Sequence, residues 1–180
     1  VLAAAKAKPG SIDVGLPSTT ARLVLELLQQ QTSTTLHAVP YKGSGASMTD
    51  LVGGQVPLAI DTVSAARALT AGGKLKPLGV TSLKDSALLP GVKSVANQGV
   101  EGFQVVAWNG FYAPRGTPAP IVAKLSAELA KILAQPEVRQ RLLELGHEPA
   151  GGSPAELGDF ARSERQKWAP LIEKAGLKAN

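Results

Sequence analysis

Three short groups of hydroxyl-bearing, glycine and acidic residues in the first half of the chain have the types and spacing of an anion-binding site. Each group follows a short apolar run: Ser18, Thr19 and Thr20; Gly43, Ser44 and Gly45; and Asp61, Thr62 and Ser64. At a helix start, free N–H groups and the helix dipole favour an anion by roughly 0.3 to 1 kcal/mol, or about 2 when partly buried. Several amide and hydroxyl bonds of about 1.5 to 3 kcal/mol each suffice for micromolar binding of a carboxylate without a fixed lysine or arginine.

The same residues also have a purely structural interpretation. Serine and threonine commonly cap helices, and glycine permits turns that other residues avoid. For Asp61, which follows a buried apolar run, a helix cap and a side chain that faces a ligand are equally consistent with the sequence. The spacing alone leaves both interpretations open.

Alternating apolar runs and amphipathic stretches predict the elements that would hold these groups together. Up to about residue 83 they predict three steps, each a strand followed by a helix, which is typical of an α/β fold with a parallel sheet. The predicted pairs are residues 12–15 and 17–31, residues 35–39 and 46–52, and residues 56–60 and 61–71. We expect the first helix to bury Leu23, Val24, Leu27 and Leu28. Helices that follow neighbouring parallel strands begin at one sheet edge, so the three polar groups are expected to converge there.

The chain changes character after Pro114. Before it, we expect a fourth strand over residues 75–81, a short helix over 93–98 and an extended crossing segment over 103–113. After it, only helices are predicted: one capped by Thr117, one beginning at Pro136, and one opened by a capping box of Ser153 and Glu156. We therefore divide the chain into an α/β ligand-binding lobe, residues 1–110, and a crossing segment with C-terminal helices, residues 111–180.

Composition excludes several classes of protein. An apolar content of 44% and a mean hydropathy of +0.06 allow a buried core. The chain contains no cysteine, which excludes disulfides and thiol chemistry. No apolar run approaches the roughly 20 residues that span a bilayer, and no signal peptide is visible at Val1. The net charge of +5 comes from scattered lysines and arginines with few aromatic residues, which argues against nucleic-acid binding.

Signals of catalysis are weak. The spacing of Gly43 and Gly45 lacks the third glycine of a dinucleotide-binding fingerprint, and neither a Walker loop nor a nucleophile elbow occurs. His37 and His147 have no acidic residue at the spacing of a metal site. We expect no enzymatic activity, no cofactor and no bound metal.

Several longer motifs make the chain resemble a known family. They are Val39-Pro40-Tyr41-Lys42-Gly43-Ser44-Gly45, Thr49-Asp50-Leu51-Val52-Gly53-Gly54-Gln55-Val56, Gly79-Val80-Thr81-Ser82, Phe111-Tyr112-Ala113-Pro114-Arg115-Gly116-Thr117-Pro118, Gln135-Pro136-Glu137-Val138-Arg139 and Gly151-Gly152-Ser153-Pro154-Ala155-Glu156. Together they cover nearly the whole chain and resemble the Bug family of tripartite tricarboxylate transporter receptors. The resemblance implies a periplasmic binding protein, of the type II-like α/β class, that captures a small carboxylate for a membrane permease.

The resemblance also implies which residues of this lobe contact the ligand. They are Ser18, Thr19 and Thr20 in the first loop, Lys42, Gly43, Ser44 and Gly45 in the second, and Asp61, Thr62 and Ser64 in the third. The first loop departs from the family pattern, which usually reads Gly-Ser-Ser-Gly, because Leu16 adds bulk and Pro17 removes an amide donor.

The family's first strands and its Pro-Gly-Gly loop are absent from this chain, so the resemblance implies only half of a binding cleft. Helices after Pro114 that pack on the first lobe in relatives are therefore expected to expose apolar stripes, and a homodimer through these helices is one way to cover them.

Two other functions compete with the receptor. A ligand-sensing domain that signals to a regulator or sensor kinase would bind the same kind of solute but present a different partner surface. A small α/β enzyme acting on an acid is disfavoured by the scarcity of histidine and the absence of cysteine.

Overall fold

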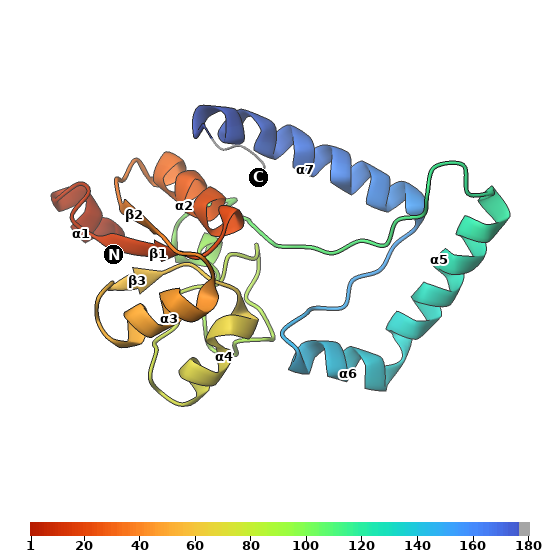
Figure 1. Ribbon diagram of the computed structural model, residues 1–180, viewed down its shortest axis with the longest axis horizontal. Helices are drawn as coiled ribbons and strands as arrows, with labels where there is room; N and C mark the ends of the chain where they lie inside the picture. The colour runs from red at the N-terminus through yellow and green to blue at the C-terminus, as the bar shows by residue number, and fades with distance from the viewer. Residues whose placement is uncertain (177–180) are drawn as a thin grey trace. The chain divides into compact units, whose positions relative to one another are not determined.

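The computed structural model describes residues 1–176 of the chain, and these form two compact units (Figure 1). The first unit contains Val1–Ala107 and residues 171–176, and the second contains Trp108–Pro170. Among the described residues, no helix combines the length and the apolar character that crossing a bilayer requires.

The first unit is built on a small parallel sheet. Its strands are β1 (Asp13–Leu16), β2 (His37–Pro40) and β3 (Leu58–Ala59), in the spatial order β2-β1-β3. Both neighbours of β1 run parallel to it. The helices of this unit are α1 (Leu2–Ala7), α2 (Thr19–Thr32), α3 (Ser44–Val52) and α4 (Val63–Ala71). The α/β class and the three strand–helix steps predicted from the sequence are therefore confirmed.

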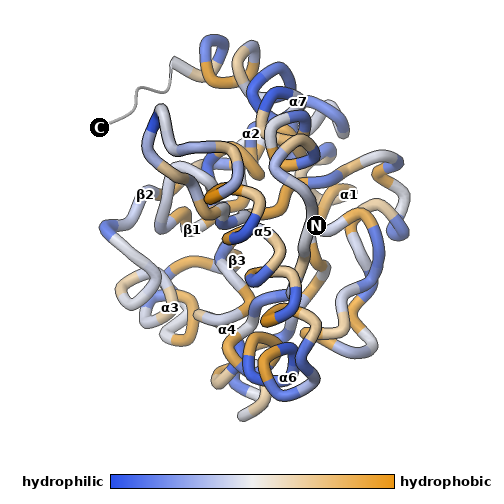
Figure 2. The backbone as a smooth tube through the Cα atoms, turned by 90° about the vertical axis from the view of Figure 1, so that its right-hand side faces the viewer, coloured by the Kyte–Doolittle hydropathy of each residue, from blue (hydrophilic) through white to orange (hydrophobic). Residues whose placement is uncertain are grey.

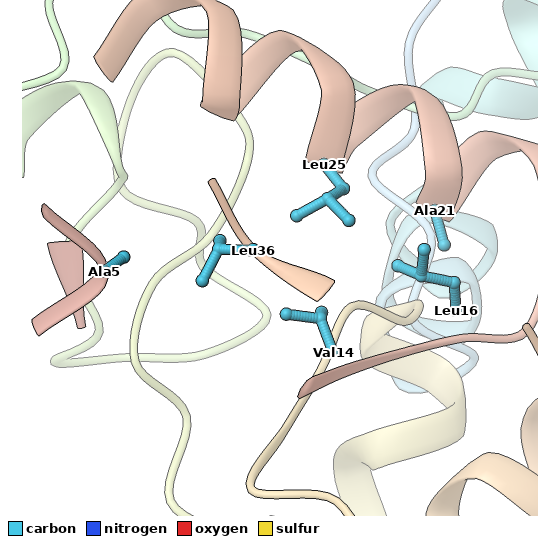
Figure 3. Packing of buried hydrophobic residues seen from close by; sticks show 6 residues of the cluster. All are labelled: Ala5, Val14, Leu16, Ala21, Leu25 and Leu36. Carbon is cyan, nitrogen blue, oxygen red and sulfur yellow. The ribbon is translucent and has the colours of Figure 1, made fainter. Parts of the chain in front are cut away.

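The main core of this unit lies between α2 and the sheet. Figure 3 shows Ala21 and Leu25 of α2 directed toward Val14 and Leu16 of β1, and all four side chains are buried. Leu25 is fully buried, which stabilises the fold by about 1.5 to 3 kcal/mol relative to an exposed leucine.

The buried face of α2 differs from the predicted one. Ala21, Val24 and Leu25 are buried, whereas Leu23 and Leu27 are only partly buried. Several leucines in succession give this helix two overlapping apolar stripes, and the stripe that includes the small Ala21 is the one that packs on β1.

The predicted fourth strand does not form. Residues 75–79 contain no strand, and Val80 makes a single isolated parallel bridge with Ser94. Pro77 lacks the N–H group that a strand needs, which is the physical reason that the apolar run does not extend the sheet. The predicted helix over residues 93–98 shortens to a 3-10 turn, η1 (Ala96–Gln98).

Asp85 holds together the loop that replaces this strand and helix. Its carboxylate accepts hydrogen bonds from the Ser94 backbone N–H at 2.8 Å, the Asn97 side chain at 2.9 Å and the Lys93 ammonium at 3.1 Å. These bonds, of which the one from Ser94 has the largest effect, lower the pKa of Asp85 to about 2. Beside the loop, the fully buried Phe103 anchors the start of the extended segment, residues 103–113, which contains neither helix nor strand.

The second unit contains α5 (Ala119–Ala134), α6 (Pro136–Glu144) and most of α7 (Pro154–Lys174). The predicted capping box of α7 is confirmed: the Ser153 backbone N–H donates to Glu156 Oε2 at 2.6 Å, and the Glu156 N–H donates to Ser153 Oγ at 3.2 Å. The prediction for Thr117 is wrong, because α5 begins after Pro118 without a side-chain cap and the Thr117 hydroxyl donates to the Pro114 carbonyl.

Apolar side chains of α5 remain exposed. Polar and apolar residues alternate along this helix (Figure 2), and Ile121, Leu125 and Ile132 retain 50%, 53% and 45% of their accessible surface. Elsewhere in the same unit, the ring of Trp108 packs edge-on against Phe160 with a centroid separation of 5.2 Å.

Candidate functional site

The three polar groups follow strands that end at the same edge of the sheet. Leu16 at the end of β1 lies opposite Pro40 at the end of β2, and Gly15 lies opposite Ala59 at the end of β3. Because the strands are parallel and in this register, the starts of α2, α3 and α4 all follow this edge. We call the three helix starts, residues 18–20, 43–45 and 61–64, the polar rim.

At the start of α2, one of the three predicted residues acts as a helix cap. Ser18 is the residue that precedes the helix, and its Oγ accepts a hydrogen bond from the Ala21 backbone N–H at 3.1 Å. Thr19 and Thr20 form the first turn and are exposed. The backbone N–H groups of the first turn have no partner within a helix, so those of Thr19 and Thr20 are directed out of the helix end.

The start of α3 has no side-chain cap. Gly43 precedes the helix with φ 146° and ψ 168°, and Ser44 and Gly45 are its first two residues, so the helix begins two residues earlier than predicted. A Cβ atom added at Gly45 would meet no atom within 4 Å, so the space around this position is open. The exposed Lys42 lies just before the helix in the sequence. This end therefore combines uncapped backbone donors with room for a small anion.

At the third position, Asp61 is not the cap of α4. That role belongs to Thr62, whose Oγ1 accepts from the Ala65 backbone N–H at 3.3 Å and from the Ser64 hydroxyl at 3.1 Å. Asp61 instead joins two helix starts, because its Oδ1 accepts from Ser44 Oγ at 2.9 Å and from the Thr62 N–H at 2.7 Å. The structure thus brings Ser44 and Asp61 into direct contact.

Two residues that sequence reasoning missed, Gly15 and Ser47, pack closely against one another next to the rim. Gly15 of β1 lies over Ser47 of α3, and a Cβ atom at Gly15 would lie 2.9 Å from Ser47 Oγ and 3.3 Å from the Tyr41 ring. Ser47 is three residues beyond Ser44, so it occupies the same helix face. This spacing, together with a glycine inside a predicted strand, is the sequence feature that could have indicated the close contact.

Tyr41, which is not in the rim, ties the loop after β2 to α3. Its hydroxyl donates to Asp50 Oδ2 at 2.8 Å, and this hydrogen bond is the largest of the effects that raise the pKa of Tyr41. The contact fixes the approach of the chain to Gly43.

Other polar features lie apart from the rim. His37 Nδ1 pairs with Asp13 Oδ1 at 2.7 Å on an exposed part of the first unit, and His147 is an exposed residue of the second. In the part of the chain that the structure describes, no three acidic or histidine side chains are grouped so that they could hold a metal ion. An open groove of about 800 Å³ in the second unit is lined mainly by small residues of α5, such as Ala123 and Ala127, and includes no rim residue.

A parallel α/β lobe whose helix starts bring hydrogen-bond donors to one sheet edge has the architecture of a small-molecule binding lobe. The family model for the tripartite tricarboxylate transporter family receptor, TctC, matches residues 1–177. The chain belongs to this family, as its sequence motifs predicted.

Individual relatives agree with this assignment. A protein of Pseudomonas sp. (strain P51), described as a UPF0065 protein in the tcbD-tcbE intergenic region, is 39% identical over the whole chain, which spans only 54% of that relative. The structure of Rpa4515 from R. palustris with adipate is 34% identical, with a TM-score of 0.82 over 97% of this chain and 59% of its own. MatC from Rhodopseudomonas palustris with bound malate is 29% identical, with a TM-score of 0.72 over 95% of this chain and 60% of its own. The chain therefore spans little more than half the length of these relatives.

Proposed function

We propose that this chain is the ligand-binding part of a periplasmic solute receptor that holds a small carboxylate for a tripartite tricarboxylate transporter. The observation that carries the proposal is the uncapped start of α3, with Gly45 in open space, at the same sheet edge as the exposed first turn of α2. Family membership and the relatives with bound adipate and malate support a carboxylate as the ligand.

The rim would hold a carboxylate mainly through backbone N–H groups. At the start of α3 the amides of Ser44 and Gly45 point out of the helix, and at the start of α2 those of Thr19 and Thr20 do the same. Charge-assisted bonds of this kind are shorter and stronger than neutral ones. Asp61 accepts the Thr62 backbone N–H just before α4, whereas at α3 it uses only the Ser44 hydroxyl. The backbone N–H groups at the starts of α2 and α3 are therefore the ones that suit an anion.

In this proposal, residues 1–110 form one binding lobe, and residues 111–180 are the crossing segment and the helices that pack on the opposite lobe in a complete receptor. The exposed Ile121, Leu125 and Ile132 of α5 are the apolar residues that such packing, or a homodimer of this chain, would cover. The permease of the transporter would be the membrane partner, and the protein would act by binding rather than by catalysis.

A pair of glycine substitutions tests the proposal on the full chain. We expect Gly45→Ala to weaken binding of adipate or malate at least about tenfold, which corresponds to about 1.4 kcal/mol. The added methyl group tilts toward the start of the helix, where the carboxylate would lie. Gly151→Ala is the matched control, because a Cβ atom there also meets nothing within 4 Å but the position lies outside the rim. Isothermal titration calorimetry and thermal shift measure binding.

Equal affinity of both variants and the unaltered chain would exclude the start of α3 as the binding site. Failure of the unaltered chain to bind any of a panel of dicarboxylates, hydroxy acids and amino acids would overturn the proposed function.

A further inference from the structure

We propose that the Ser44–Asp61 pair presents a hydrogen-bond acceptor at the polar rim. The protein would then select carboxylates that carry a hydroxyl or ammonium group beside the carboxylate. This inference rests on the proposed function and names the class of ligand within it. A hydroxy or amino dicarboxylate is then preferred over an unsubstituted dicarboxylate of the same length.

The direction of one hydrogen bond decides what Ser44 can offer to a ligand. Ser44 Oγ donates to Asp61 Oδ1 at 2.9 Å, and a carboxylate oxygen accepts but does not donate. A serine hydroxyl has a single hydrogen, so this bond uses the only one that Ser44 has. What Ser44 offers to a ligand is a pair of acceptor sites, and these suit an O–H or N–H donor rather than another carboxylate oxygen.

Hydrogen bonds hold the Asp61 side chain in place. Its Oδ1 accepts from the Thr62 backbone N–H at 2.7 Å as well as from Ser44, and these donors come from two different helix starts. Its Oδ2 is buried and has no hydrogen-bond partner among the described residues. Oδ2 is therefore closed to a ligand, and Oδ1 already accepts two hydrogen bonds, so in this proposal Asp61 acts through Ser44 as a positioning residue.

The charge of Asp61 also favours a hydrogen-bond donor of the ligand next to Ser44. A carboxylate placed against the Ser44 hydroxyl would lie close to the Asp61 carboxylate that this hydroxyl contacts, and like charges in a partly desolvated site repel strongly. A hydroxyl or ammonium group at this point avoids the repulsion. The ligand carboxylate would then lie at the uncapped amides of α3 and α2, with its neighbouring donor directed toward Ser44.

Malate and succinate test this inference, because they differ by one hydroxyl group. We expect the full chain to bind malate at least about tenfold more tightly than succinate in a titration followed by ¹⁵N NMR. We expect Ser44→Ala to reduce this ratio to about one through weaker malate binding, and Ser44→Thr, which keeps a hydroxyl, to restore most of the preference. In Asp61→Asn, loss of the negative charge should tighten succinate binding and lower the ratio.

Thr49→Val is the matched control. It removes a hydroxyl from the same helix, where Thr49 Oγ1 donates to the Gly45 carbonyl and makes no contact with Asp61, so the ratio should not change. Urea unfolding of each variant separates loss of preference from loss of fold.

The outcomes distinguish the two proposals. Equal affinity for malate and succinate, or a preference for malate that survives Ser44→Ala, would overturn the proposed acceptor role of Ser44 and leave the proposal of carboxylate binding intact. Failure of both ligands and of every other carboxylate would overturn the proposed function and this inference together.

Discussion

The backbone of Gly43 predicts that two neighbouring glycines respond to alanine in opposite directions. With φ 146° and ψ 168°, Gly43 occupies a region essentially restricted to glycine, and forcing alanine into it costs about 1 to 3 kcal/mol. A Cβ atom at Gly43 would meet nothing within 4 Å, so the cost is backbone strain alone. Gly45 also has open space but lies in the first turn of α3, where alanine is favoured over glycine by at most the roughly 0.5 to 1 kcal/mol that applies in a helix interior.

We therefore expect Gly43→Ala to lower the free energy of unfolding and Gly45→Ala to raise it slightly, with a gap of about 1 to 4 kcal/mol between the variants. Urea unfolding followed by far-UV circular dichroism measures both, and an unchanged slope with urea would show that only stability has changed. A Gly43→Ala variant as stable as the unaltered chain, or a Gly45→Ala variant less stable than Gly43→Ala, would contradict this expectation. Because Gly45→Ala should leave the fold intact, weaker carboxylate binding by this variant would come from the changed binding site and not from a loss of stability.

Three further predictions concern the first unit. Gly15→Ala should cost about 1 to 3 kcal/mol, since its Cβ would lie 2.9 Å from Ser47 Oγ; adding Ser47→Ala should recover part of the loss, and strictly additive effects in urea unfolding would contradict the close contact. Phe103→Ala should lower the free energy of unfolding by about 3 to 5 kcal/mol because the ring is fully buried, and a loss below about 1 kcal/mol would show that the cavity collapses. For Asp85, the folded-state pKa of about 2 lies below its ordinary value of 3.8, so its contribution to stability is present above about pH 4 and is lost as the pH falls toward 2. Asp85→Asn should therefore lose less stability than the unaltered chain over this pH range, and identical acid profiles would refute the assignment.

Local sequence patterns were sufficient to predict the elements whose ends are marked by capping residues, proline or glycine. The three strand–helix steps, the start of α6 at Pro136 and the capping box of Ser153 and Glu156 all depend on residues within four positions of one another. These elements depend on the backbone preferences and capping contacts of neighbouring residues, so a short stretch of sequence is enough to predict each of them. The long motifs added the family, because a set of motifs in fixed order is far more specific than any one of them.

Contacts between distant residues needed the tertiary structure. The sheet order β2-β1-β3 places β3 beside β1, and α3 connects β2 to β3 across it. This topology brings Ser44 to Asp61, which lies 17 residues further along the chain, and sets Ser47 against Gly15. From the sequence, Asp61 was equally consistent with a helix cap and a ligand contact. In the structure Thr62 is the cap of α4, and Asp61 accepts hydrogen bonds from Ser44 and Thr62.

The amino-acid sequence by itself determined the class of fold, the family and, to within two residues, the three helix starts from which the rim is built. The tertiary structure decided which side chains at those starts bond to one another, and therefore which groups the proposed ligand would face. The physical reason is that a helix start depends on local backbone geometry and capping, whereas the hydrogen of the Ser44 hydroxyl is directed by a carboxylate that only the strand order brings within 2.9 Å.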